Sequence, residues 1–170
     1  MRENVREHSA TVGKIAHRLA LMSEKKGIPI NPSAVLASGL LHDLAKTWCI
    51  RNYGSHAMLG ASWVIRETGD YNVAQGVLFH VRWPWPLPEG DSICVLPILV
   101  LYADKRARHA ECVTLDERFE DLLVRYGINS ASREGIKKSL LEAREIEKRL
   151  SQVLGADIGS VDFCSCLNDS

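Results

Sequence analysis

The dipeptide His42-Asp43 places two metal-binding side chains inside the otherwise apolar run of residues 39–45. Burying an imidazole or a carboxylate is costly unless a partner satisfies its polar atoms. Both groups are also common ligands of transition-metal ions in proteins. The position of this pair in an apolar stretch therefore predicts an interior metal site.

Four further side chains of the same types lie beside apolar residues at helical spacing: His8, His56, His80 and Asp104. His8 comes three residues after Val5 and four before Val12, so it lies on the apolar face of its predicted helix. Asp104 comes four residues after Val100 and is expected to face inward in the same way. The remaining histidines have no such support and are interpreted as ordinary hydrogen-bonded residues: His17 and His109.

Together these side chains predict a metal centre with one or two divalent transition-metal ions. The first ion is expected on His8, His42, Asp43 and Asp104. The second is expected on His56, His80 and a bridging Asp43, about 3.5–4 Å from the first. Imidazole and carboxylate ligands favour Fe or Mn, with Zn, Ni, Co or Mg as alternatives. Such a pair of ions can clamp a phosphoryl group and generate a hydroxide near neutral pH.

Basic side chains follow several of these positions and predict a site for an anionic substrate. The residues expected to bind substrate are Lys46, Arg82, Lys105 and Arg106. Arginine matches phosphate oxygens with two parallel hydrogen bonds, whereas lysine acts as a point charge. The run from Lys105 to Arg108 has an alternative interpretation, a solvated helix end whose charge complements the helix dipole.

The bulk composition describes an ordinary globular chain of 170 residues, 46% apolar and 25% charged. Lysine plus arginine and aspartate plus glutamate number 21 each, giving a formal net charge of zero. This balance argues against general nucleic-acid binding, which needs a basic surface. No apolar run reaches the ~20 residues of a membrane span, and the N-terminus has no signal-peptide pattern. We therefore expect a cytoplasmic protein with no membrane partner.

Apolar residues at helical period predict an all-α fold, because no strand-like alternation or hairpin signal of useful length appears. The expected helices cover residues 5–25, 31–48, 56–67, 72–80, 93–108, 115–126 and 131–154. The absence of a linker predicts one domain over residues 1–155, with a flexible C-terminal tail over 156–170. The charged face of the last helix is expected to be solvated, although it could support a homodimer.

Two smaller features leave alternatives open. The five cysteines, at positions 49, 94, 112, 164 and 166, have an odd count and no framework spacing, which predicts reduced thiols. Cys164 and Cys166 could bind a soft metal or lie in a disordered tail. The proline-rich segment 83–88 carries Trp83 and Trp85, which could stack a base or brace the bundle.

The ordered set of six candidate ligands resembles the HD superfamily of metal-dependent phosphohydrolases. The segment 40–46, Leu-Leu-His-Asp-Leu-Ala-Lys, is similar to one motif of that family, and residues 101–106 are similar to its final motif. The resemblance covers roughly residues 5–126. It implies an all-helical bundle with a central metal site that hydrolyses phosphomonoesters or phosphodiesters, often in nucleotides. The six-ligand pattern resembles the two-metal branch, which includes bacterial hydrolases of diadenosine tetraphosphate and the cyclic-dinucleotide phosphodiesterases.

The resemblance implies a hydrolase that cleaves a phosphate ester or anhydride bond in a small nucleotide-like substrate. Asp43 and Lys46 are the expected catalytic residues. The mononucleotide phosphatase branch has a glutamate where this chain has Lys46, so a hydroxide on the metal would act without that base. Two alternatives remain: a di-iron oxygenase, as in related HD proteins, and a degenerate sensor that binds nucleotides without turnover. Oxygen-dependent activity without phosphate release would identify the oxygenase. Tight nucleotide binding without hydrolysis would identify the sensor.

Overall fold

The structure is a computed structural model that describes residues 1–165, and the predicted all-α fold is confirmed. A hairpin of two very short strands is the one piece of sheet among these residues. The elements are α1 (Glu3–Lys25), α2 (Pro32–Leu41), α3 (Lys46–Asn52), α4 (His56–Thr68), α5 (Tyr71–Phe79), η1 (Gly90–Cys94), α6 (Leu96–Lys105), β1 (Ala107–Arg108), β2 (Glu111–Cys112), α7 (Leu115–Tyr126), α8 (Ser130–Leu154) and η2 (Ile158–Ser160).

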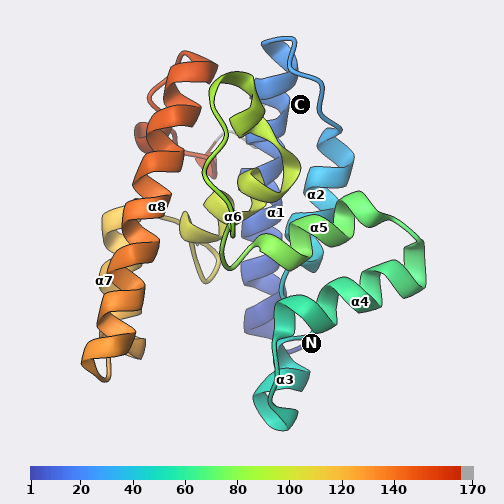
Figure 1. Cartoon of the computed structure of the whole chain (residues 1–170), viewed down its shortest axis with the longest axis vertical. Helices are drawn as coiled ribbons and strands as arrows, with labels where there is room; N and C mark the ends of the chain where they lie inside the picture. Colours follow the sequence, from blue (N-terminus) through green and yellow to red (C-terminus); the bar gives the residue numbers. More distant parts are fainter. Residues whose placement is uncertain (166–170) are drawn as a thin grey trace.

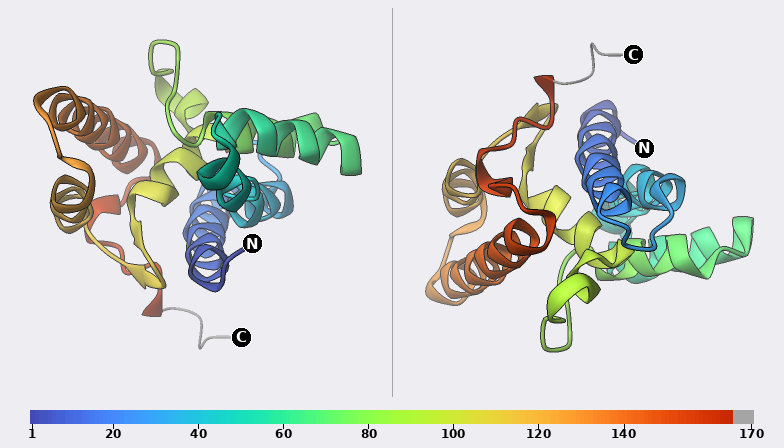
Figure 2. Two further views of the ribbon diagram at one scale, coloured as in Figure 1. Left: turned by 90° about the horizontal axis from the view of Figure 1, so that it is seen from below. Right: turned by 90° about the horizontal axis from the view of Figure 1, so that it is seen from above.

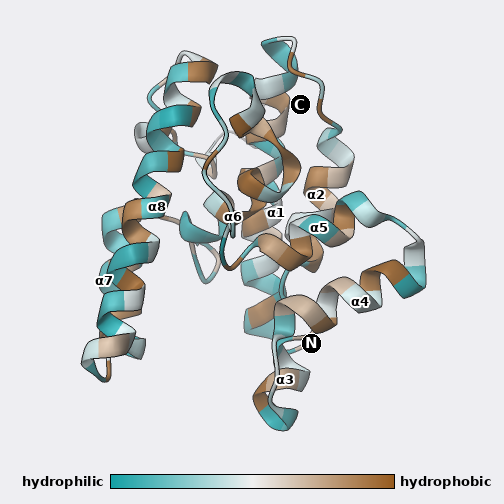
Figure 3. Ribbon diagram, in the orientation of Figure 1, coloured by the Kyte–Doolittle hydropathy of each residue, from teal (hydrophilic) through white to brown (hydrophobic). Residues whose placement is uncertain are grey.

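Helices α1 and α6 lie in the middle of the bundle (Figure 1). The α4–α5 pair lies on one side of them and the α7–α8 pair on the other, as the two end-on views also show (Figure 2). Helix α6 is buried along almost its whole length, and its apolar residues join those of α1 and α8 in the main core. The hydropathy colouring shows apolar residues on the inner sides of the helices and polar residues outside (Figure 3). No helix within residues 1–165 has the length and apolar character to cross a bilayer.

Local signals in the sequence place the starts of two helices that carry site residues. Asn31 caps α2 by accepting a hydrogen bond from the Ala34 N–H at 3.2 Å, and Pro32 fills the first turn. Ser55 caps α4 in the same manner, accepting from the Met58 N–H at 3.3 Å. The second cap fixes the start of α4 immediately before His56.

The second expected helix, residues 31–48, is divided in the structure into α2 and α3 by a turn at residues 42–45. Backbone hydrogen bonds from Leu44 N–H to Leu41 O and from Lys46 N–H to Asp43 O, at 2.9 and 3.0 Å, span three residues instead of four. On a straight helix, neighbours point about 100° apart. The tighter turn allows His42 and Asp43 to face the same site.

A close backbone approach fixes the position of α2 against α1. A Cβ atom added at Gly39 would lie 2.6 Å from the Cα of Gly13, closer than any real contact. Glycine at both positions therefore allows the two helices to cross at backbone distance. This crossing lies one turn before His42 and five residues after His8, so it sets the separation of two candidate ligands.

The fifth expected helix, residues 93–108, is shorter than predicted. The chain first forms η1 and an extended residue, Val95, and α6 begins only at Leu96 because Pro97 fits the first turn of a helix. After Lys105 the chain turns into the β1–β2 hairpin, in which Arg108 pairs with Glu111. The sequence does not predict this hairpin, because its strands, of two residues each, are too short to show alternation.

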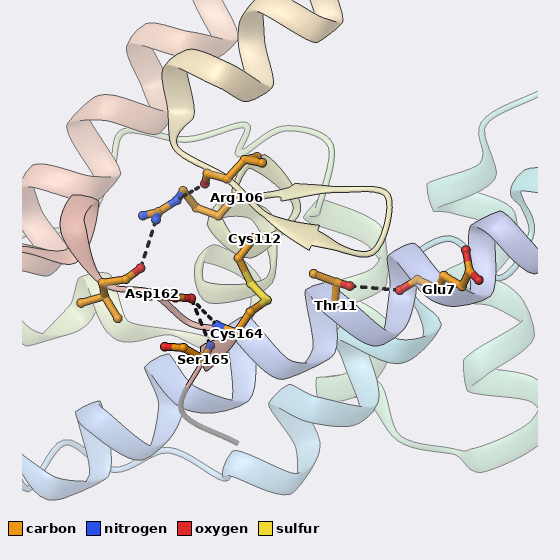
Figure 4. Close-up of a disulfide and its surroundings, with 9 residues drawn as sticks. Glu7, Thr11, Arg106, Cys112, Asp162, Cys164 and Ser165 are labelled. Carbon is orange, nitrogen blue, oxygen red and sulfur yellow. Dashed lines mark hydrogen bonds between the residues drawn. A yellow bond between two sulfur atoms is a disulfide. The ribbon is translucent and has the colours of Figure 1, made fainter. Parts of the chain in front are cut away.

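The expectation that all cysteines are reduced is wrong for two of them. Cys112 on β2 forms a disulfide with Cys164, across 52 positions of the chain (Figure 4). Cys49 and Cys94 are free and buried, while Cys166 lies outside the described residues. A soft-metal site on Cys164 is excluded in this state because its sulfur is already bonded.

Residues 156–165, which sequence analysis placed in a flexible tail, are part of the packed body. Ile158 and Phe163 are 0% and 1% exposed and belong to the main core. The proline-rich segment before η1 is a brace: the indole of Trp83 packs on Trp85 and Phe79, and Arg149 of α8 donates to the backbone of residues 87 and 88. Both segments fasten α8 to the bundle.

Candidate metal centre

The fold gathers the six side chains that the sequence singled out. They come from every part of the central bundle: His8 from α1, His42 and Asp43 from the turn after α2, His56 from the start of α4, His80 from the end of α5, and Asp104 from the last turn of α6. Ligand atoms of His8, His42 and Asp104 lie within 4.8 Å of one another, as do those of His42, Asp43 and His80. His56 joins these five through its Nε2, which lies 3.2 Å from His80 Nε2, so the six positions form one connected cluster.

Asp43 lies at the centre of the cluster and presents its two oxygens to different neighbours. Its Oδ2 is 3.4 Å from His42 Nε2, while its Oδ1 is 3.3 Å from His56 Nε2 and 3.7 Å from His80 Nε2. On the far side of His42, Asp104 Oδ1 lies 3.0 Å from His8 Nε2. This geometry matches two adjacent cation positions that share the Asp43 carboxylate.

The two most buried histidines, His42 and His80, have their Nδ1 atoms held by backbone carbonyls. The Nδ1 of His42 is 2.7 Å from the Gly39 carbonyl, and the Nδ1 of His80 is 2.7 Å from the Val77 carbonyl. Each carbonyl can only accept, so Nδ1 carries a proton, and in the neutral ring Nε2 has a lone pair facing the cluster. A backbone or carboxylate partner on the second ring nitrogen is the usual arrangement around a bound metal.

Two buried atoms in the cluster lack a hydrogen-bond partner within the described part of the chain: His42 Nε2 and Asp43 Oδ1. Unsatisfied buried polar atoms are rare in folded proteins and cost about 1–3 kcal/mol each. A lone pair on nitrogen and a carboxylate oxygen are both electron-pair donors, so a cation would satisfy both. The residues present therefore fit a divalent metal ion.

The electrostatics of the cluster also favour a bound cation. Burial disfavours charge on His42, yet Asp43 beside it raises the net pKa of His42 above its ordinary value. Burial likewise raises the pKa of Asp43, but His42 and Lys46 outweigh it and keep that pKa well below the usual range. Burial lowers the pKa of His80 to about 3 and also lowers that of His56. His56 and His80 are therefore neutral beside an ionised carboxylate, and the Asp43 carboxylate favours a positive charge at His42, a place that a metal ion can take.

Lys46 and Lys105, both expected to contact substrate, each lie against one ligand carboxylate. Lys46 Nζ donates to Asp43 Oδ2 at 2.6 Å, and Lys105 Nζ donates to Asp104 Oδ2 at 2.7 Å. The Lys46 side chain is 39% exposed, so it can turn toward a ligand, whereas Lys105 is 10% exposed. The two lysines balance the two carboxylates of the cluster.

Arg82 comes two residues after His80 and lines a separate cavity instead of lying against the cluster. This cavity has a volume of about 650 Å³, is bounded by α6, α7 and α8, and also includes Lys105. Its wall is partly apolar, with Phe119, Leu122 and Ile136, and its size falls in the usual range for organic ligands, ~300–1,000 Å³. Through Lys105 it adjoins the Asp104 side of the cluster.

Arg106 was expected to bind substrate, but its guanidinium points away from the cluster and holds the C-terminal segment. It is 3% exposed and donates to the carbonyls of Val113, Ile158 and Val161 at 2.6, 2.8 and 3.2 Å. It also donates to the Tyr102 hydroxyl at 2.7 Å (the surroundings are shown in Figure 4). The structure therefore assigns Arg106 a structural role, because its donors are used within the fold.

A smaller recess of about 160 Å³ also opens at the cluster, and the sequence does not predict most of its lining residues. It reaches His8, Asp43 and Lys46, and its further lining includes Arg2, His109, Arg118, Arg125 and Tyr126. Arg118 and Arg125 are seven residues apart on α7, a spacing that places them on one face of a helix. That periodic pair was the available signal, but nothing in the sequence shows that this face of α7 points toward the cluster.

Comparison with known proteins identifies the family. The HD domain matches residues 5–116, a range that contains all six clustered side chains. An uncharacterized protein of Methanocaldococcus jannaschii is 29% identical over 163 residues, which cover 87% of this chain and 90% of the relative. No solved structure gives a significant match. Because the family match spans more than half of the chain and the predicted motifs lie within it, this protein belongs to the HD-domain family.

Proposed function

We propose that this protein is a metal-dependent phosphohydrolase that cleaves a phosphate ester or anhydride bond in a small nucleotide-like substrate. The observation that carries the proposal is the central Asp43 carboxylate, with one oxygen facing His42 and the other facing His56 and His80. Membership of the HD family, whose domains are generally metal-dependent hydrolases, supports the same reaction class.

The six clustered side chains would hold one or two divalent ions, with iron or manganese expected first. His8, His42 and Asp104 belong to one position, His56 and His80 to the other, and Asp43 to both. When bound, such ions polarise a phosphoryl oxygen and make water acidic enough to attack near neutral pH. The proposal therefore requires no additional cofactor.

The remaining side chains would bind and orient the substrate. Hydrolysis forms a bond between a water oxygen and phosphorus, breaks the bond to the leaving oxygen, and delivers a water proton to that oxygen. Lys46, partly exposed beside Asp43, is placed to neutralise charge on the phosphoryl oxygens. Arg82 and Lys105 line the larger cavity, which has the size and apolar wall suited to an organic group.

The test is metal analysis of the purified protein, followed by turnover assays on a panel of nucleotides and dinucleotides after loading with Mn²⁺ or Fe²⁺. We expect about two ions per chain and release of phosphate or a mononucleotide. Asp43→Asn should lose both ions and turnover, whereas His56→Gln should lose one ion. Asp91→Asn, an exposed aspartate in η1, is the matched control and should change neither.

Three outcomes would contradict the proposal. If Asp43→Asn keeps wild-type metal content and turnover, the cluster is not the active centre. Oxygen consumption with iron and no phosphate release would identify an oxygenase. Tight nucleotide binding by the metal-loaded protein without hydrolysis would identify a sensor.

A further inference from the structure

The small recess beside the metal cluster has a strongly positive lining. Its charged side chains are four cations, Arg2, Lys46, Arg118 and Arg125, and one carboxylate, Asp43. The chain as a whole has a formal net charge of zero. The recess lining therefore carries a net positive charge although the chain as a whole has none, and a concave positive surface raises the local concentration of anions.

Two of these cations are supplied by one face of α7 and are positioned by a shared carboxylate. Asp121 lies between them and accepts Arg118 Nη1 at 3.3 Å on one oxygen and pairs with Arg125 Nε at 2.9 Å on the other. The single negative charge of Asp121 fixes both guanidinium groups but neutralises only one of them. A net positive charge remains on this face.

Arg118 retains a donor that the described residues leave unused. Its side chain is 13% exposed, and its Nε–H is buried without a hydrogen-bond acceptor. A buried donor on a charged group is costly to leave unpaired. Phosphate oxygens are suitable acceptors for guanidinium groups, because the pairing is charge-assisted and can be bidentate.

The sizes of the two cavities distinguish what each can hold. The positive recess, about 160 Å³, is smaller than the ~300 Å³ at which cavities for organic ligands begin. The cavity at Arg82 and Lys105, about 650 Å³, is well within that range. A compact anion fits the first cavity and an organic group the second, with the metal cluster adjoining both.

We propose that Arg118 and Arg125 bind a second, uncleaved phosphoryl group of the substrate, so that the preferred substrates carry at least two linked phosphoryl groups. The proposal rests on the phosphohydrolase function proposed above. Both arginines lie beyond residue 116, outside the stretch that matches the HD domain. This subsite would therefore be a property of the chain's own α7 and not of the shared metal centre.

Binding to the Mn²⁺-loaded protein provides the first test. Methylenediphosphonate and methylphosphonate, measured by calorimetry, are uncleaved probes with two phosphorus groups and one. We expect wild type to bind the diphosphonate at least about 10-fold more tightly, and Arg118→Gln to lose about 10- to 100-fold for the diphosphonate alone. Arg66→Gln removes the same charge from an exposed position on α4 and should leave both affinities unchanged.

Turnover provides the second test, with adenosine diphosphate and adenosine monophosphate as substrates that differ in one phosphoryl group. Arg118→Gln and Arg125→Gln should lower kcat/KM for the diphosphate about 10- to 100-fold and for the monophosphate by less than about 2-fold. Arg125 is partly exposed, so its variant tests the proposal even if Arg118→Gln fails to fold.

The outcomes separate the two proposals. Equal losses on both substrates, or no loss on either, would overturn the second-phosphoryl subsite while leaving phosphohydrolase activity in place. If wild type hydrolyses no phosphorylated compound but Arg118→Gln still loses its preference for the diphosphonate, the phosphohydrolase function fails and the subsite stands.

Discussion

Replacing Arg106 with methionine should destabilise the protein without changing its substrate recognition. The guanidinium makes four hydrogen bonds while 3% exposed, and it lies 3.5 Å from Glu147. Removing one member of a buried ion pair costs about 3–5 kcal/mol. Glu147 is 23% exposed and stays hydrated, so we expect the lower part of that range, about 3–4 kcal/mol.

For a chain of this length that loss corresponds to a fall in melting temperature of roughly 6–16 °C. Urea denaturation measures the free energy of unfolding directly and thermal melting checks it. Arg108→Met is the matched control, because the side chain of Arg108 pairs with an exposed Glu111 in a contact worth about 0–1 kcal/mol.

The reasoning is refuted if Arg106→Met melts within about 2 °C of wild type, or if Arg108→Met costs as much. Turnover by the folded variant is the second readout. A loss of kcat/KM by orders of magnitude at unchanged stability would show that Arg106 binds substrate, as the sequence pattern had suggested.

Three further perturbations test other parts of the structure. Gly39→Ala should cost about 1–3 kcal/mol of stability and weaken metal binding, because its Cβ would lie 2.6 Å from the Gly13 Cα. The control Gly135→Ala, which has open space around it, should be neutral or stabilising by up to about 1 kcal/mol. Similar melting curves for the two variants would contradict the close approach. Cys112→Ser should lower the free energy of unfolding by about 4 kcal/mol, the loop-closure value for a ring of this size. Dithiothreitol should reproduce this loss in wild type and leave the stability of the variant unchanged. A wild-type melting temperature that is insensitive to reductant would argue against the disulfide. Burial raises the pKa of Glu142, so the folded state holds the carboxyl proton more tightly than the unfolded chain and loses stability as the pH rises through this pKa. Glu142→Gln should therefore raise the melting temperature at pH 7 and lose this advantage below about pH 4. An equal gain at both pH values would show that the pKa shift is absent.

The positions of most helices and the membership of the cluster followed from local patterns. His8 and Asp104 share helix faces with buried apolar residues, and Asn31 and Ser55 are strong N-caps. Such signals depend on a few neighbouring residues, so they can be interpreted before the fold is known. The break after Leu41 could not be predicted, because no proline or glycine lies in residues 42–45 to mark it.

The parts that escaped prediction depend on contacts between distant segments. Arg106 and Arg118 are both arginines in or beside predicted helices, and the sequence offers no means of deciding which one faces the cluster. In the structure Arg106, which was expected to bind substrate, anchors the C-terminal segment, and Arg118, for which the sequence gives no expectation, lines the recess. Cys112 and Cys164 are 52 positions apart in the sequence, and only the path of the chain after α8 brings them together.

The Cys112–Cys164 bond also changes what a cut in the backbone can do. It closes residues 112–164 into a covalent ring that contains α7, α8 and the exposed turn around Ile128 between them. A protease that cleaves this turn leaves two fragments that remain one molecule, separable only after reduction. Helix α7, with Arg118 and Arg125, would stay attached to the bundle through β2 and to α8 through the sulfur atoms. A nicked chain would therefore keep α7 and α8 covalently joined under oxidising conditions and lose this link under reducing ones.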